Sequence, residues 1–80
     1  MRQKEIRRLI SLCLSEMYAV SEPPITDKFN RNTVDPKNHR IDEKLFDEIR
    51  TKYKKKLNPQ GRYELDHELI FFAPMFKKEK

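Results

Sequence analysis

Two segments in which apolar residues recur at helical spacing, each followed by proline, set the limits on the fold. Residues 2–20 place apolar side chains at the i, i+3, i+4 and i+7 positions of an amphipathic helix. Pro23 and Pro24 end that helix, because proline has no backbone N–H and disfavours helical geometry in the residue before it. The predicted buried stripe consists of Ile6, Leu9, Ile10, Cys13, Leu14 and Met17.

Residues 42–57 form the second predicted helix, and its start is the clearest local signal in the chain. Asp42 can accept hydrogen bonds from the free N–H groups of the first turn, and Ile41 and Phe46 are spaced as a hydrophobic staple. Acidic residues crowd its first half and lysines its second half, as the helix dipole favours. The Asn58-Pro59 pair ends it. Its predicted stripe consists of Leu45, Phe46, Ile49, Tyr53 and Leu57.

Residues 62–72 follow a turn signal at Gln60-Gly61 and carry two competing periodicities. Apolar and acidic residues alternate over the first seven positions, which predicts a strand. A helix is the alternative, because Leu65, Leu69, Phe72 and Phe76 have helical spacing, although Pro74 would lie inside it.

The sequence therefore predicts an α+β fold, with the helices 2–20 and 42–57 packed on a short C-terminal strand or hairpin near 62–72. The alternative is an all-α three-helix domain. Because one strand is not a sheet, a second strand would have to come from residues 25–41 or from another chain. The length of 80 residues predicts a single small domain over 1–76, followed by a basic tail at 77–80.

Residues 21–41 are the least regular part of the chain. We expect an ordered connection there, because a structureless loop of this length is unusual in a small domain. Asp35-Pro36-Lys37-Asn38 predicts a turn. The apolar residues predicted to hold this connection against the core are Ile25, Phe29, Val34 and Ile41.

The composition excludes several classes of protein. No apolar run reaches the roughly 20 residues of a membrane span, and no secretory leader pattern is present. The single glycine excludes glycine-rich phosphate loops, and the single cysteine excludes an internal disulfide framework. One unpaired cysteine fits a reducing compartment, so we expect an intracellular protein, cytoplasmic or nuclear. We find no enzymatic motif and predict no cofactor.

Two further clusters have stronger structural explanations than chemical ones. Asp66-His67-Glu68, with the distant His39, is the only cluster with metal-ligand chemistry, but on a strand its side chains would point to opposite faces. No metal site is therefore predicted. Cys13 lies on the apolar stripe of the first helix, which predicts a buried and unreactive thiol.

The net charge of +5 makes an anionic partner possible. A small basic nucleic-acid-binding protein is the alternative function, with phosphate contacts made by lysine and arginine side chains. Interspersed acidic residues oppose it, because they break any continuous basic stripe. The candidate residues are Arg2, Lys4, Arg7, Arg8, Lys52, Lys54, Lys55 and Lys56.

The preferred function is a non-enzymatic protein-interaction module, such as a small regulatory subunit, an inhibitor or a domain of a larger protein. The C-terminal segment has more large apolar side chains than so small a core is expected to hold, and a surplus of this kind commonly marks a partner surface. The partner would be another protein chain or a second copy, not a membrane or a small-molecule substrate. The candidate binding residues are Tyr63, Leu69, Ile70, Phe71, Phe72, Met75 and Phe76.

Overall fold

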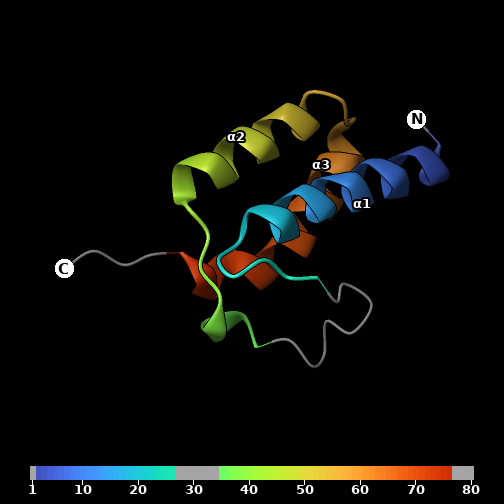
Figure 1. Ribbon diagram of the computed structural model, residues 1–80. Helices are drawn as coiled ribbons and strands as arrows, with labels where there is room; N and C mark the ends of the chain where they lie inside the picture. The colour runs from blue at the N-terminus through green and yellow to red at the C-terminus, as the bar shows by residue number, and fades with distance from the viewer. Residues whose placement is uncertain (1, 27–34, 77–80) are drawn as a thin grey trace.

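The computed structural model describes residues 2–26 and 35–76, and it is 75% helical. Each of the three α-helices packs against the other two (Figure 1). In chain order the elements are α1 (Gln3–Val20), the 3-10 helix η2 (Pro36–Asn38), α2 (Glu43–Lys54), α3 (Pro59–Glu68) and the 3-10 helix η3 (Leu69–Met75).

The predicted α+β fold is wrong, and the all-α alternative describes the molecule. Residues 62–72, expected to be a strand, lie within α3 and η3. Extended pairing in the described part of the chain is limited to two isolated bridges, Glu22 with Arg40 and Ile41 with Phe76. The residues of 25–41 that the structure describes supply no second strand. The helix forms because Leu65, Leu69 and Phe72 bury one face against the rest of the core, which overrides the local alternation.

The predicted extent of the first helix is confirmed, and so is most of its predicted buried stripe. Ile6, Ile10, Cys13 and Met17 are buried, whereas Leu9 and Leu14 are half-buried. At the C-terminal end the Ser21 hydroxyl is buried and donates a hydrogen bond to the Tyr18 carbonyl oxygen at 2.7 Å. This bond satisfies a carbonyl that the end of the helix would otherwise leave without an intrahelical partner.

The second helix begins as predicted and ends earlier. Asp42 is its N-cap and accepts a hydrogen bond from the Leu45 N–H at 3.2 Å. The staple residues Ile41 and Phe46 are both buried. The predicted end was residue 57, but α2 ends at Lys54. A tighter turn of the 3-10 type follows, in which the Leu57 N–H donates to the carbonyl oxygen of Lys54, three residues earlier.

The third helix begins at the Asn58-Pro59 pair, which follows the turn after α2. The Asn58 side chain accepts a hydrogen bond from the Gly61 N–H at 2.8 Å, and Pro59 occupies the first helical position, where its missing N–H costs nothing. Gly61 is buried, and a Cβ at this position would lie 2.7 Å from Cδ2 of Leu57. The glycine therefore permits a close approach of α3 to Leu57 in the turn after α2.

Replacing Asn58 with alanine is expected to lower the free energy of unfolding by about 0.5–2 kcal/mol, because the first turn of α3 loses its side-chain acceptor. Urea unfolding followed by circular dichroism measures the change. The matched control is Asn58→Asp, which keeps an oxygen acceptor and adds a charge that the helix dipole favours. A loss in the aspartate variant as large as that in the alanine variant would contradict the capping role.

The C-terminal segment η3 explains how the surplus apolar residues are accommodated. Leu69, Phe72 and Met75 are spaced by three residues, and a 3-10 helix has three residues per turn. All three side chains therefore share one face, and all three are buried. The Met75 carbonyl oxygen accepts a hydrogen bond from the Ile41 N–H at 3.1 Å, which joins the end of η3 to the segment before α2.

The predicted ordered connection is confirmed where the structure describes it. Ile25 and Ile41 are buried, and the predicted turn forms η2, in which the Asp35 side chain accepts from the Lys37 N–H at 3.0 Å. Glu22 and Arg40 exchange two backbone hydrogen bonds of 2.7 and 2.9 Å. Phe29 and Val34, the other two residues predicted to hold this connection, lie outside the described residues, as does the predicted tail at 77–80.

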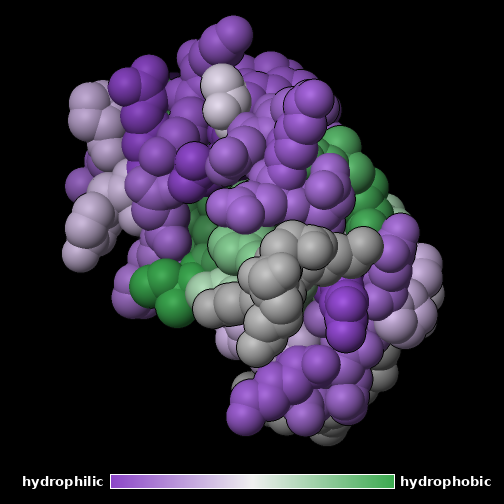
Figure 2. All heavy atoms as spheres, turned by 90° about the vertical axis from the view of Figure 1, so that its left-hand side faces the viewer, coloured by the Kyte–Doolittle hydropathy of each residue, from purple (hydrophilic) through white to green (hydrophobic). Residues whose placement is uncertain are grey.

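One hydrophobic cluster joins residues from α1, α2, α3 and η3. The surface around it is mostly hydrophilic on the face shown in Figure 2, where hydrophobic residues appear in small separate areas. Three large apolar side chains in the described residues are substantially exposed: Leu12, Tyr63 and Ile70.

Candidate functional site

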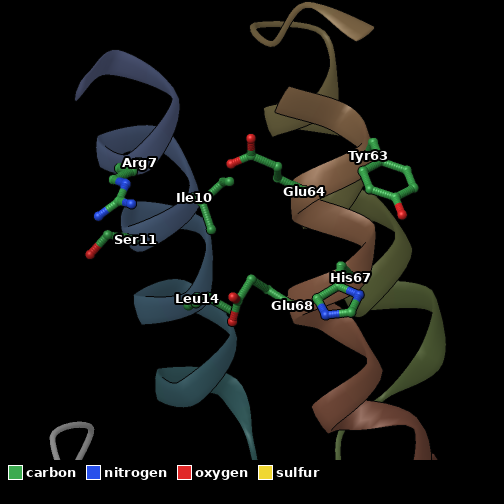
Figure 3. A pocket seen from close by; sticks show the side chains of 8 residues that line it. All are labelled: Arg7, Ile10, Ser11, Leu14, Tyr63, Glu64, His67 and Glu68. Atoms are coloured by element: carbon green, nitrogen blue, oxygen red, sulfur yellow. The ribbon is translucent and has the colours of Figure 1, made fainter. Parts of the chain in front are cut away.

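A groove between α1 and α3 is the candidate functional site. The hollow has a volume of about 680 Å³ and is open to solvent along one side. The α1 wall is mixed aliphatic and polar, and the α3 wall is aromatic and acidic (Figure 3). The lining residues are Arg7, Ile10, Ser11 and Leu14 from α1 and Tyr63, Glu64, His67 and Glu68 from α3.

The two walls of this α1–α3 groove run side by side in the same direction. Near the start of α1, the Gln3 side-chain amide donates to a Glu64 carboxylate oxygen at 3.3 Å. Near its end, the Tyr18 ring lies 5.5 Å from the Phe72 ring, centroid to centroid. The first contact joins α1 to α3, and the second joins α1 to η3, the segment that continues α3, so the groove lies between the two contacts.

Each of the two helices contributes a pair of lining side chains that are one turn apart. Ile10 and Leu14 are one turn apart on α1 and lie between the two helices (Figure 3). Glu64 and Glu68 are one turn apart on α3 and point toward α1, whereas Tyr63 stands on the outer side of α3. The floor of the groove is therefore aliphatic, and its α3 wall carries two carboxylates.

The charges of the groove are unequal on its two sides. Glu64 is held by two neutral amides, because Gln60 donates to its other carboxylate oxygen at 2.9 Å in addition to the bond from Gln3. These bonds fix the direction of the carboxylate without neutralising it. Arg7, on the α1 wall, supplies a positive charge on the opposite side. A ligand in the groove would thus meet negative charge on α3 and positive charge on α1.

The structure separates the seven predicted protein-binding residues into core and surface groups. Leu69, Phe72 and Met75 are buried, and Phe71 and Phe76 are half-buried and packed against the core. Tyr63 and Ile70 remain accessible, with 72% and 63% of their surface exposed. The core therefore absorbs most of the apolar surplus, and only these last two residues offer large apolar surface to a partner. The expected strand edge does not exist.

The sequence analysis does not predict that α1 and α3 form the two walls of one groove. It assigns Arg7 and Tyr63 to different functions, considers Glu68 only within a rejected metal cluster, and does not place Ser11 or Glu64 among the candidate site residues. A helical interpretation of residues 62–72 would have shown the signal, because Glu64 and Glu68 then share a face at i and i+4. No signal within either segment indicates that α3 lies beside α1.

The predicted basic cluster on α2 is partly used in contacts between helices. Lys52 donates to both carboxylate oxygens of Glu16 at 2.9 and 3.0 Å, and Lys54 donates to Asp66 at 2.8 Å. Lys55 and Lys56 are exposed. All four residues of the second cluster are exposed; Arg2 immediately precedes α1, and Lys4, Arg7 and Arg8 lie on it.

A second polar arrangement joins α1 to α2 around Glu16. The Tyr53 hydroxyl and the Lys52 ammonium group both donate to the Glu16 carboxylate. The hydrogen bond from Tyr53, and secondly that from Lys52, holds the pKa of Glu16 below its usual value. The same bond from the other side raises the pKa of Tyr53 to about 12. Hydrogen bonds within the protein are the largest cause of both shifts.

The metal interpretation of Asp66-His67-Glu68 gains no support. Among the residues that the structure describes, no three His, Cys, Asp or Glu side chains lie close enough to hold a metal ion. Asp66 forms an ion pair with Lys54. The distant His39 donates through Nδ1 to the Pro23 carbonyl oxygen at 2.7 Å.

Comparison of the chain with protein families, with curated proteins and with solved structures found no match. In the described ranges, none of the helices is long and apolar enough to cross a membrane. The function is therefore inferred from the geometry and charge of the α1–α3 groove.

Proposed function

We propose that the chain is a non-enzymatic protein-interaction module that works inside the cell and receives a segment of its partner in the α1–α3 groove. A small regulatory subunit, an inhibitor or a domain of a larger protein would have this property. The observation that carries the proposal is the open groove with an aliphatic floor and the exposed ring of Tyr63 on its outer edge.

Three features of the groove support a protein as its ligand. A groove between two neighbouring helices is a common receptor for a peptide or helix from another chain. Exposed aromatic side chains such as Tyr63 are frequent energetic anchors at interfaces. The polar groups of the groove stand on its walls, so they can form a polar rim around an aliphatic centre made by Ile10 and Leu14.

The nucleic-acid alternative receives less support. Phosphate binding by Lys52 and Lys54 would compete with their ion pairs to Glu16 and Asp66. Glu64 and Glu68 in the groove would repel a phosphate backbone. Arg7 and Arg8 are exposed on α1, but Arg7 lines a groove whose other wall is acidic.

Photo-crosslinking tests the proposed function. A photoreactive amino acid at Tyr63 is expected to form a covalent adduct with another polypeptide in extract of the cells that naturally make the chain. The matched control carries the same amino acid at Thr51, which is exposed on α2. A second variant, Ser11→Trp, places a bulky side chain at the groove and is expected to abolish the adduct from Tyr63.

Two results would contradict the proposal. The first is the absence of an adduct from position 63, and the second is an adduct that forms equally from position 51 or persists when Ser11 is replaced by tryptophan. Circular dichroism of each variant verifies that the helices are intact.

A further inference from the structure

We propose that a hollow at the corner where α2 ends and α3 begins binds a phosphate monoester, the group carried by a phosphorylated side chain or by a small phosphorylated molecule. The residues that line this corner hollow are Thr51, Lys54, Lys55 and Arg62. It shares no residue with the α1–α3 groove, so the inference goes beyond the proposed function and does not depend on it.

The charge of the corner hollow has one sign. In the described part of the chain its lining consists of three cationic side chains and one hydroxyl, without a carboxylate. Two larger hollows have mixed linings, because the α1–α3 groove contains Glu64 and Glu68, and a hollow along α2 contains Asp47 and Glu48. Like charges that share one hollow repel one another, and an anion bound between them would relieve that repulsion.

The Arg62 side chain is already oriented by the protein. Its Nε donates a hydrogen bond at 2.9 Å to the carbonyl oxygen of Lys54, the last residue of α2. A guanidinium group has five N–H donors, and this bond uses one of them. The terminal nitrogens form a planar fork that matches two oxygens of one phosphate. Because the backbone bond fixes the direction of this fork, less conformational entropy is lost when a ligand binds.

Lys55 and Thr51 supply the other contacts. The two side chains are one turn apart near the end of α2, and both are exposed. An ammonium group adds positive charge, and a hydroxyl adds a neutral donor for a phosphate oxygen. Lys54 contributes less, because its ammonium group is paired with Asp66 at 2.8 Å. Arg62, Lys55 and Thr51 are therefore the expected ligand-binding residues.

The size and the surroundings of the corner hollow favour a monoester over a nucleic-acid backbone. Its volume of about 340 Å³ is near the lower end of the range for ligand sites, roughly 300–1,000 Å³. Acidic residues flank it, since Asp66 is paired with Lys54 and Glu48 lies one turn before Thr51. A phosphodiester chain would continue past these carboxylates, whereas a monoester ends at the hollow. The monoester also carries a charge of about −1.5 to −2 at neutral pH and three terminal oxygens.

Titration of the isotope-labelled protein with O-phosphoserine tests the inference, with sodium chloride holding the ionic strength constant. The backbone amide resonances of Thr51, Lys55 and Arg62 are expected to shift together and to saturate, while those of α1 stay unchanged. Dimethyl phosphate, a singly charged diester, represents a nucleic-acid backbone. It is expected to bind at least about threefold more weakly, because it has a smaller charge and fewer terminal oxygens.

Charge-neutralising variants locate the site. Lys55→Gln and Arg62→Gln are each expected to weaken the binding of O-phosphoserine roughly threefold, because each removes one exposed charged contact. The matched control is Arg8→Gln, which changes the net charge equally at an exposed position on α1 and is expected to leave the affinity unchanged. If Arg62→Gln does not fold, the exposed Lys55→Gln carries the comparison with Arg8→Gln. Circular dichroism verifies that the helices of each variant are intact.

Three results would overturn the inference. The first is the absence of saturable shifts, or shifts that spread over the basic residues of every helix. The second is equal affinity for O-phosphoserine and dimethyl phosphate, which would favour a phosphodiester ligand. The third is a loss of affinity in Arg8→Gln as large as that in the folded variants of Lys55 and Arg62, which would show attraction by net charge alone.

Phosphoserine peptides with varied flanking residues distinguish the two sources of the monoester. A peptide that binds at least about threefold more tightly than O-phosphoserine would assign the corner hollow to a phosphorylated protein. Equal affinity for all peptides and for O-phosphoserine would assign it to a small phosphorylated molecule, and both results support a monoester site. The crosslink from position 63 is measured separately, so failure of the monoester site and failure of the α1–α3 groove are distinguishable.

Discussion

Replacing Phe72 with alanine is expected to lower the free energy of unfolding by about 3–5 kcal/mol, the largest effect of any substitution considered. A domain of this length has a total stability of about 4–12 kcal/mol. The thermal midpoint should therefore fall by about 12 °C or more. Thermal unfolding followed by circular dichroism measures the change.

The physical reason is the central place of Phe72 in the core. Its side chain is fully buried, and its ring lies 5.5 Å from that of Tyr18 on α1, 5.9 Å from that of Phe46 on α2 and 5.3 Å from that of Phe71. Alanine would leave a cavity at the point where η3 meets both helices, and it would remove three aromatic contacts at once.

The matched control lies two residues away in the same 3-10 helix. Ile70 is 63% exposed, so Ile70→Ala is expected to change the free energy of unfolding by less than about 0.5 kcal/mol. The pair separates the burial of Phe72 from any general sensitivity of η3. Equal losses in the two variants would show that η3 does not present the face that the structure describes.

The sequence predicted the first two helices and failed at the third for a specific reason. In the first two, stripes that repeat over about three turns allow one interpretation. Over residues 62–72, the positions Leu65 and Leu69 satisfy a period of two as well as a period of 3.6, so local pattern does not decide between strand and helix. The deciding residues, Phe72 and Met75, follow a third period, that of the 3-10 helix.

Turn chemistry was the second source of the error. The sequence analysis predicts Asn58-Pro59 only as the end of the second helix and Gln60-Gly61 only as a turn. The same residues form an N-cap followed by proline at the first helical position, which is a helix start signal. Gly61 is needed because of its close approach to Leu57, a tertiary reason that the sequence alone does not show.

The candidate site was less predictable than the fold. Its residues come from segments about 50 positions apart in the chain, and Arg7 and Tyr63 were singled out without any reason to place them on opposite sides of one groove. The sequence analysis also lists Lys52 and Lys54 as candidate phosphate-binding residues, whereas each forms an ion pair with a carboxylate on another helix. Pairing of this kind depends on the packing of the helices.

The predicted burial of Cys13 is confirmed, and it leads to a large expected effect on thiol reactivity. Burial, and secondly the negative charge of Glu16, raises the pKa of the Cys13 thiol from 9.0 to about 12. Because the thiolate is the reactive form, a soluble disulfide reagent at pH 8 should react at least about 100-fold more slowly with the folded chain than with the chain in urea. Equal rates in the two conditions would show that the side chain is accessible.

The same shift predicts how stability depends on alkaline pH. Since the folded-state pKa of Cys13 is raised, its neutral form contributes stability that is fully present below pH 9.0 and is lost as the pH rises toward about 12. Tyr53 acts in the same direction between pH 10.0 and about 12, because its hydroxyl donates to Glu16 only while protonated. The urea midpoint should therefore fall steadily above pH 9. Cys13→Ala is expected to delay that fall until Tyr53 titrates, and Cys13→Ala combined with Tyr53→Phe to remove most of it. If the double variant lost stability with rising pH as steeply as the native chain, neither Cys13 on α1 nor Tyr53 on α2 would be responsible for the fall.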